Sequence, residues 1–91
     1  MLLHPSPNWA KSLDVYTEVF AQNFTAIAMD TPGYGYSDPL NILEPEIADF
    51  AEALKETLDA LGIEKCGIWG SHTGATIAIE FCVRYPERVS I

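Results

Sequence analysis

The chain has 91 residues, 13 of them acidic and 5 basic, which gives a net charge of −8 at pH 7. So few basic residues cannot form a patch that neutralises phosphates or anionic lipid headgroups, which argues against nucleic-acid and membrane partners. The hydrophobic fraction of 48% is typical of a folded domain. No apolar run reaches the roughly 20 residues that a membrane-spanning helix needs, and the N-terminus lacks the basic region of a signal peptide. We expect one small cytoplasmic domain.

Two strands and a helix are predicted in the first third of the chain. Residues 1–4 have the apolar character of a buried strand, which Pro5 ends. Asn8 is a candidate N-cap for a helix over 9–21, in which apolar residues recur at spacings of three and four. The apolar residues of that stripe are Leu13, Tyr16, Val19 and Phe20. The almost entirely apolar run over 24–29 predicts a strand covered on both faces.

A loop and a second helix follow. Residues 30–39 are dense in Gly, Pro and Asp, as in loops. The sequence Glu44-Pro45-Glu46 opens a helix with acidic residues at its positive end, and Gly62 ends it. One face of this helix carries the apolar residues Ile47, Phe50, Ala51, Leu54, Leu58 and Leu61.

The last third repeats the alternation of strand and helix. Residues 66–69 predict a strand, residues 75–85 a helix that Pro86 ends, and residues 88–91 the beginning of a fourth strand. Cys66 and Cys82 have no Cys-x-x-Cys spacing, so we expect buried free thiols and a reducing compartment.

Strands that alternate with helices predict an α/β domain with a parallel sheet, at least three strands and three helices. Both ends of the chain fall inside predicted strands. A sheet of three strands at about 90 residues also buries a smaller share of its surface than a larger domain does. We therefore expect the chain to be part of a longer protein, and residues 1–91 alone to be inactive and poorly soluble.

The sequence Trp69-Gly70-Ser71-His72-Thr73-Gly74-Ala75 is the most informative segment. It lies between a predicted strand and a predicted helix, and its Gly-x-residue-x-Gly pattern is that of a nucleophile elbow. In such an elbow the central residue occupies a strained, exposed turn. The centre is usually serine, but here it is His72, and Ser71 stands one place earlier.

Together with two further segments, this turn resembles the α/β-hydrolase superfamily, in particular its small-molecule hydrolases. Leu2-Leu3-His4-Pro5-Ser6-Pro7 is similar to the family's strand and His-Gly oxyanion loop, and Asp30 to Asp38 is similar to its D-x-P-G-x-G-x-S loop. Glu80 to Val89 resembles the family's helix that ends in Y-P-E-R-V.

The resemblance implies a three-layer fold in which the strand at 1–4 lies between those at 24–29 and 66–69. It identifies residues 1–91 as the N-terminal part of the domain, from the oxyanion loop to the helix after the elbow. The family's catalytic acid and histidine follow the elbow in chain order. Both, and the cap over the substrate pocket, would then lie outside this chain.

The resemblance also implies roles for individual residues. The oxyanion hole would consist of the backbone amides of Ser6 and Thr73; Pro5 replaces the usual Gly but is not itself the donor. His4, at the mouth of a central strand, would organise the loop by ring hydrogen bonds and border the substrate site together with Tyr34. Asp30 would anchor the Gly33-Tyr34-Gly35 turn.

His72 at the elbow tip admits several interpretations. A neutral imidazole can attack a carbonyl carbon, and the labile acyl-imidazole can then react with water; alternatively, the ring can act as a general base on a bound water. Ser71 is the rival nucleophile, but a shift of one residue displaces it by about 3.3 Å, which is large for catalysis. A third interpretation is that the elbow serves folding and binding only.

We therefore expect an α/β-hydrolase-fold protein that hydrolyses small ester- or amide-type substrates, with a catalytically silent small-molecule binder as the alternative. No cofactor is expected, because the glycines at 33–35 lack dinucleotide spacing. A metal site from His4, Asp30 and His72 has suitable ligand types but no ligand spacing, so no metal is expected either. The substrate and the oligomeric state are not predicted.

Overall fold

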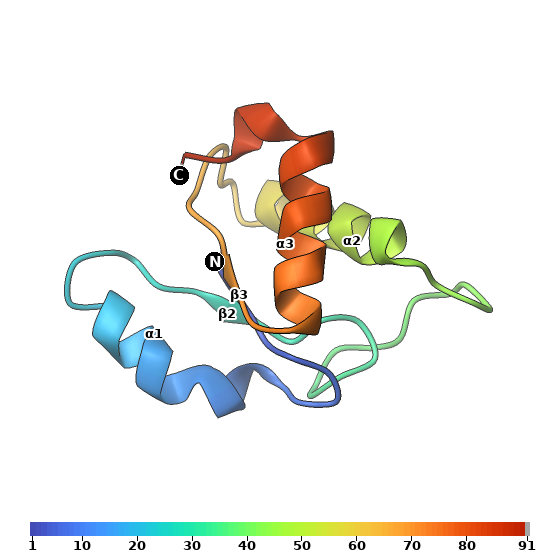
Figure 1. The fold of residues 1–91 in the computed structure, drawn as a ribbon, viewed down its shortest axis with the longest axis horizontal. Coiled ribbons are helices and arrows are strands. Elements are labelled where there is room, and N and C mark those ends of the chain that lie inside the picture. Colours follow the sequence, from blue (N-terminus) through green and yellow to red (C-terminus); the bar gives the residue numbers. More distant parts are fainter. Residues whose placement is uncertain (91) are drawn as a thin grey trace.

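The computed structural model describes residues 1–90 and confirms the alternation of strands and helices (Figure 1). In chain order the elements are β1 (Leu2–Leu3), η1 (Ala10–Leu13), α1 (Asp14–Phe20), β2 (Ala28–Met29), α2 (Ile47–Ala60), β3 (Trp69–Gly70), α3 (Thr73–Arg84) and η2 (Pro86–Arg88). The elements η1 and η2 are short 3₁₀ helices.

The three strands form one parallel sheet in the order β2-β1-β3, as the sequence predicted. Leu2 pairs with Ala28 on one side and with Trp69 on the other. All three strands therefore end at the same edge of the sheet, and the loops that follow them start from neighbouring points.

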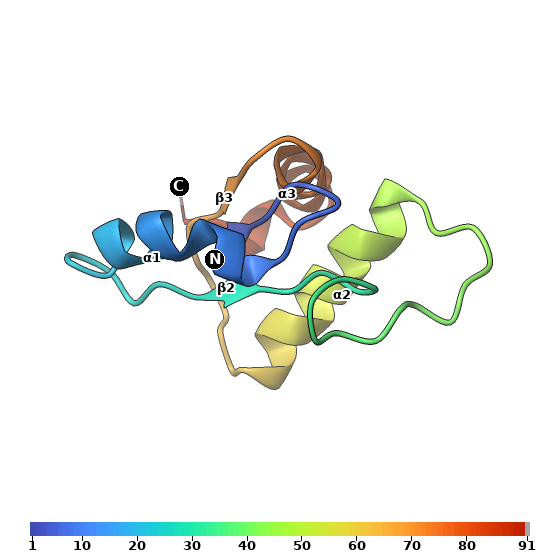
Figure 2. The same ribbon diagram turned by 90° about the horizontal axis from the view of Figure 1, so that it is seen from below.

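Helices cover the two faces of the sheet unequally. α2 and α3 lie together on one side of the strands and α1 lies on the other, which gives three layers (Figures 1 and 2). The main core is between β1 and the α2–α3 pair, where Leu3 is fully buried. Its other buried members are Ala51, Leu54, Leu58, Ile77 and Phe81.

The prediction for the first helix was partly wrong. Asn8 is not its N-cap, because the Asn8 amide donates to Pro5 O in a turn. The helical segment begins with the 3₁₀ helix η1, and Trp9 stands at the N-cap position without a capping hydrogen bond from its side chain. Of the predicted apolar stripe, Leu13 is buried, whereas Tyr16 and Val19 are 51% and 58% exposed. The stripe is amphipathic in sequence, and α1 packs against β3 through the rings of Tyr16 and Phe20, whose centroids lie 5.0 Å and 6.4 Å from that of Trp69.

The strands are shorter than predicted, because a strand extends only as far as its partner. β1 has two residues, so only Ala28 and Met29 of the run at 24–29 pair with it. Cys66 lies outside β3 and forms an isolated parallel bridge with Val89. The predicted fourth strand over 88–91 is represented among the described residues by this single bridge at Val89. Its last residue, Ile91, lies outside the described residues. Both cysteines are free, as predicted, but half-buried and not buried.

Helices α2 and α3 agree well with the sequence. At the start of α2 a capping box joins Glu46 and Asp49, and beyond its end Gly62 has a φ of +71°. Helix α3 begins at Thr73, two residues earlier than predicted, directly after His72. Starting the helix there brings its positive end to the elbow tip.

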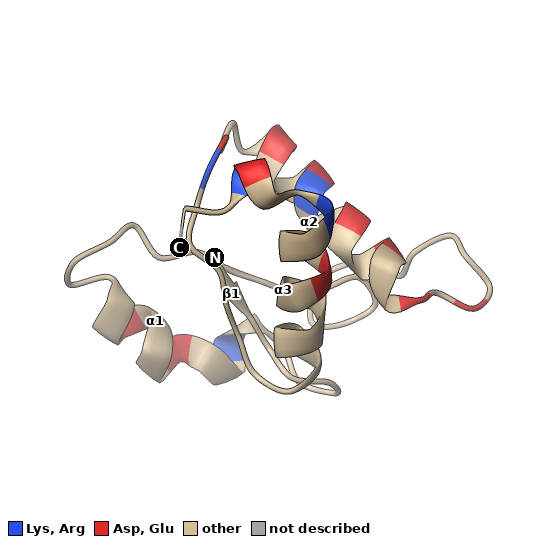
Figure 3. Cartoon of the chain, turned by 45° about the horizontal axis from the view of Figure 1, so that its top comes forward, with Lys and Arg blue, Asp and Glu red and all other residues tan. Residues whose placement is uncertain are grey.

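Acidic residues are present on all three α-helices (Figure 3). Arg88 offsets part of this charge: its Nη1 lies 2.8 Å from Asp59 Oδ1, and this contact holds the pKa of the Asp59 carboxyl below its usual range. Within residues 1–90, none of the helices has both the length and the apolar character needed to cross a membrane.

Candidate active site

Three loops meet at the carboxyl ends of the strands, which is where ligands bind in open α/β sheets. The loop after β1 contacts the turn after β3, since the Ser6 amide lies 3.4 Å from Thr73 Oγ1. It also contacts the loop after β2, since the Thr31 amide lies 3.1 Å from His4 Nε2. The structure thus joins segments that are 27 and 67 residues apart in sequence.

Close packing explains the two glycines of the turn between β3 and α3. A Cβ atom added at Gly74 would lie 2.2 Å from Leu3 O, and one added at Gly70 would lie 2.4 Å from Gly74 O. The first turn of α3 therefore rests directly on the backbone of β1, with no space for a side chain between them. This contact holds the intervening residues at the edge of the sheet.

His72 occupies the tip of this turn in a strained conformation. Its φ of 53° and ψ of −114° make it the only residue other than glycine with a positive φ among residues 1–90. Such a conformation costs an L-residue on the order of 1–3 kcal/mol and persists only where the surroundings enforce it. The side chain is exposed, and its ring makes no hydrogen bond to any residue from 1 to 90. His72 is thus presented to solvent at the N-terminus of α3.

Ser71 is held differently. Its amide donates to Leu3 O at 3.2 Å and its carbonyl accepts from the Gly74 amide at 2.9 Å, so its backbone continues the pairing of β3 with β1. Its side chain is half-buried. Ser71 therefore belongs to the supporting part of the turn, one residue before the tip.

The two amides expected to form an oxyanion hole lie close to the tip. Thr73 is the first residue of α3, so its amide has no carbonyl one turn earlier in the helix to bind. The Ser6 amide donates to the Thr73 hydroxyl, a contact that the sequence did not predict. Both donors therefore lie around the same residue, which follows His72 directly.

His4 is 1% exposed and uses both ring nitrogens. Nδ1 lies 2.9 Å from Pro5 O, which can only accept, so Nδ1 carries the proton; Nε2 is then free to accept from the Thr31 amide. The ring of Tyr34 packs edge-on against His4, with centroids 5.6 Å apart. His4 therefore organises the loop as expected, and neither ring nitrogen is free to bind a substrate.

Asp30 anchors the loop after β2, as expected. Its carboxylate accepts from the amides of Ala10 at 2.7 Å and Tyr36 at 3.0 Å, and these two hydrogen bonds hold its pKa below the usual range. Gly35, with a φ of 56°, leaves no space for a Cβ, which would lie 2.3 Å from the Asp30 carboxylate. Asp30 thus joins the start of η1 to the Gly33-Tyr34-Gly35 turn.

Comparison with known proteins agrees with this geometry. The family model described as alpha/beta hydrolase fold matches residues 4–90. The chain belongs to the α/β-hydrolase family. A 2-hydroxy-6-oxononadienedioate/2-hydroxy-6-oxononatrienedioate hydrolase of Pseudomonas putida is 33% identical over 93 residues, which cover 98% of this chain and 32% of that protein. Human epoxide hydrolase 4 is 31% identical over 90 residues, which cover 98% of the chain and 25% of that protein.

Solved structures show the same fold. Est816, an N-acyl homoserine lactone degrading enzyme, superposes with a TM-score of 0.88 at 30% identity, over 97% of this chain and 34% of that one. The matched region makes up 25% to 34% of the length of the α/β hydrolases named here. The chain therefore spans about a quarter to a third of the length of these relatives. These relatives are enzymes that act on small molecules, and most are named as hydrolases.

Two contacts of this α/β-hydrolase site could not be read from the sequence. One is the pairing of His4 with Thr31, whose hydroxyl oxygen also lies 3.0 Å from Nε2. The other is the Thr73 hydroxyl, which accepts from the Ser6 amide. For the first contact the sequence does offer one indication. Thr31 directly follows Asp30, at the end of the strand predicted to lie next to the strand that carries His4.

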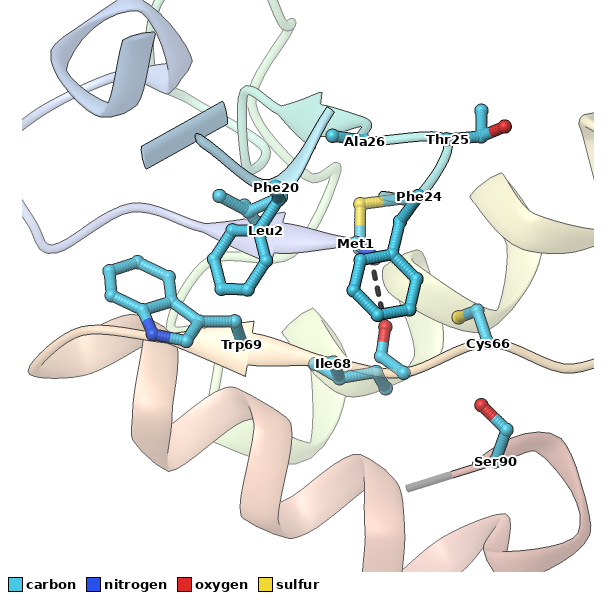
Figure 4. A pocket seen from close by; sticks show the side chains of 11 residues that line it. Met1, Leu2, Phe20, Phe24, Thr25, Ala26, Cys66, Ile68, Trp69 and Ser90 are labelled. Atoms are coloured by element: carbon cyan, nitrogen blue, oxygen red, sulfur yellow. Dashed lines mark hydrogen bonds between the residues drawn. The ribbon is translucent and has the colours of Figure 1, made fainter. Parts of the chain in front are cut away.

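An apolar hollow lies away from the elbow tip. A cavity of about 460 Å³ lies beside β1 and β3 and is lined by Phe20, Phe24, Ile68 and Trp69, among others (Figure 4). The Trp69 ring stacks on Tyr16 there, with centroids 5.0 Å apart. His72 does not line this cavity. We place the site at the elbow because the strained backbone and the amide donors are there.

A metal centre has no support in the described residues, since residues 1–90 contain no group of three or more His, Cys, Asp or Glu side chains arranged to hold an ion. In particular, both ring nitrogens of His4 are hydrogen-bonded, to Pro5 O and to the Thr31 amide. The Asp30 carboxylate accepts hydrogen bonds from backbone amides. The polar groups around His72 are instead backbone donors, which suit a developing negative charge on oxygen.

Proposed function

We propose that the protein carrying this chain is a hydrolase of small ester- or amide-type substrates, in which the His72 imidazole is the nucleophile. The observation that carries the proposal is the backbone of His72. A positive φ at a residue that is not glycine, between a strand and a helix, is the conformation that presents a nucleophile in this fold. Because this strain is retained at a histidine, we infer that the exposed ring has a function there.

The chemistry follows from the position of the ring. A neutral ring nitrogen attacks the substrate carbonyl carbon, and the leaving group departs from the tetrahedral intermediate. Water then hydrolyses the acyl-imidazole, which releases the acid and restores His72. The exposure of the ring supports this sequence of steps, since both substrate and water can reach it.

Two backbone donors support the same reaction. In the proposed complex the substrate oxygen takes the place of the Thr73 hydroxyl as acceptor for the Ser6 amide, and it also accepts from the Thr73 amide. Loss of one such donor typically lowers kcat by about 10²–10³-fold. His4 acts indirectly, since its bond to Pro5 O fixes the loop that carries Ser6.

One observation favours the alternative of a silent binder: the Ser6 amide is already occupied by the Thr73 hydroxyl. At 3.4 Å this hydrogen bond is long, so a substrate oxygen can displace it. We also propose a cytoplasmic location, on the grounds of the acidic composition and the two free cysteines.

The test is kcat/KM of the complete natural protein on p-nitrophenyl butyrate, for the wild type, His72→Ala and Ser71→Ala. We expect His72→Ala to lose at least about 100-fold, and Ser71→Ala to stay within a few-fold of the wild type. Free imidazole at the same concentration is the control for uncatalysed imidazole chemistry. Full activity of His72→Ala would refute the role of His72, and an inactive wild type that binds butyrate analogues would favour the binder.

A further inference from the structure

We infer that the side-chain hydroxyl of Thr73 is a third hydrogen-bond donor to the oxyanion, beside the backbone amides of Ser6 and of Thr73 itself. The inference rests on the proposed function and adds a further catalytic residue to it. The two amides belong to the backbone, whereas this donor is a side chain, so its role can be tested by substitution.

The Thr73 hydroxyl lies on the side of α3 where the substrate oxygen would bind in the proposed complex. Thr73 Oγ1 is 3.4 Å from the Ser6 nitrogen and accepts its hydrogen bond. The Thr73 amide is the first of α3, so it has no acceptor one turn earlier in the helix. The amide nitrogen and the hydroxyl oxygen belong to the same residue, with only Cα and Cβ between them. An oxygen atom that accepts from both amides therefore also lies beside the hydroxyl.

A threonine hydroxyl can change from acceptor to donor. It has two lone pairs and one proton, and the proton turns about the Cβ–Oγ1 bond to suit its partners. Without substrate, a lone pair of Oγ1 accepts from the Ser6 amide, and this bond does not use the proton. When the substrate oxygen takes over the Ser6 amide, the hydroxyl turns its proton toward that oxygen. The proton stays on Oγ1, so the bonds made and broken in the proposed reaction are unchanged.

The position of Thr73 suits a donor to a developing negative charge. Its backbone is fixed by the next residue, Gly74, because α3 rests there directly on the backbone of β1. Thr73 is half-buried, which shields its hydroxyl partly from water. A hydrogen bond to an ionised oxygen is roughly twice as strong as one to a neutral oxygen. The hydroxyl therefore stabilises the tetrahedral intermediate more than the bound substrate, and its loss should lower kcat and leave KM nearly unchanged.

The experiment measures kcat and KM of the complete natural protein on p-nitrophenyl butyrate. Thr73→Val keeps the shape of the side chain without the hydroxyl, and Thr73→Ser keeps the hydroxyl without the methyl group. Thr57→Val is the matched control, since Thr57 is also half-buried in a helix but its hydroxyl donates to Ala53 O at 2.8 Å within α2. We expect Thr73→Val to lower kcat by about 10²–10³-fold. Thr73→Ser and Thr57→Val should keep kcat within about threefold of the wild type.

The outcomes separate this inference from the proposed function. If Thr73→Val keeps kcat within about threefold of the wild type while His72→Ala is inactive, the hydrolase proposal stands and the role of the Thr73 hydroxyl is wrong. If Thr73→Ser loses as much activity as Thr73→Val, the methyl group is what the site needs, which also overturns the inference. If His72→Ala is as active as the wild type, the nucleophile proposal itself fails, and the kcat of Thr73→Val still decides the role of the hydroxyl.

Discussion

Gly74 is the residue whose substitution tests most sharply how the site is built. A Cβ atom at this position would lie 2.2 Å from Leu3 O and 2.9 Å from His4 O. Ordinary contact begins at 3.4 Å, so Gly74→Ala requires α3 and β1 to separate by up to 1.2 Å. The atoms in the way belong to the backbone of a central strand and cannot rotate aside. The first turn of α3 must move, and His72 must move with it.

The size of the effect follows from this displacement. Overpacking of this kind costs about 1–3 kcal/mol, and the better helix propensity of Ala returns about 1 kcal/mol. We therefore expect the free energy of unfolding to fall by up to about 2 kcal/mol. Because a displacement of about 1 Å at a reacting group typically costs 10²-fold, kcat/KM on p-nitrophenyl butyrate should fall by about 100-fold.

Gly67→Ala is the matched control. It is the same substitution, but a Cβ at Gly67 meets its nearest neighbour, Ser90 Oγ, at an ordinary 3.9 Å. We expect this variant to stay within about twofold of the wild type in kcat/KM. Urea unfolding and esterase assays of the two variants side by side make the comparison. If Gly74→Ala behaves like Gly67→Ala in both assays, the packing of α3 on β1 does not position the elbow tip.

Three further substitutions test the surrounding network. His4→Ala leaves a cavity and an unpaired Thr31 amide, so urea unfolding should show a loss of about 2–4 kcal/mol; a loss below 1 kcal/mol would contradict the network. Asp30 has a lowered pKa, so its carboxylate stabilises the fold above the ordinary carboxyl pKa of about 3.9, and that stability is lost as pH falls through the lower folded value. Asp30→Asn should therefore destabilise at pH 7 but much less near pH 2, and an equal loss at both pH values would refute the assignment. Asp49→Ala removes the acceptor of the Glu46 amide, 2.7 Å away, and should lower the Tm by a few degrees, whereas an unchanged Tm would show that the capping box contributes nothing.

The tight turn between β3 and α3 could be predicted from the sequence because its constraints are local. Gly70 and Gly74 stand at fixed distances on either side of His72, between a strand pattern and a helix pattern. The structure then supplies the reason for the glycines, which is the close approach of α3 to β1. The strand order and the anchoring role of Asp30 were also predicted correctly.

The remaining differences arise from contacts between distant parts of the chain. Strand lengths depend on the partner, so the apolar run at 24–29 shows its composition but not where pairing stops. The exposure of Tyr16 depends on what packs against α1, which periodicity cannot reveal. The bonds from Thr31 to His4 and from Ser6 to Thr73 join loops that only the folded sheet brings together.

The claim that His72 forms a covalent bond with the substrate can be tested directly. The complete natural protein is mixed with p-nitrophenyl butyrate, quenched within the first turnover, digested and analysed by tandem mass spectrometry. The account predicts a butyryl group on the His72 ring, which is absent from His72→Ala and formed at the rate of the p-nitrophenolate burst. A butyryl group on Ser71, or turnover with no acyl-protein intermediate, would contradict it.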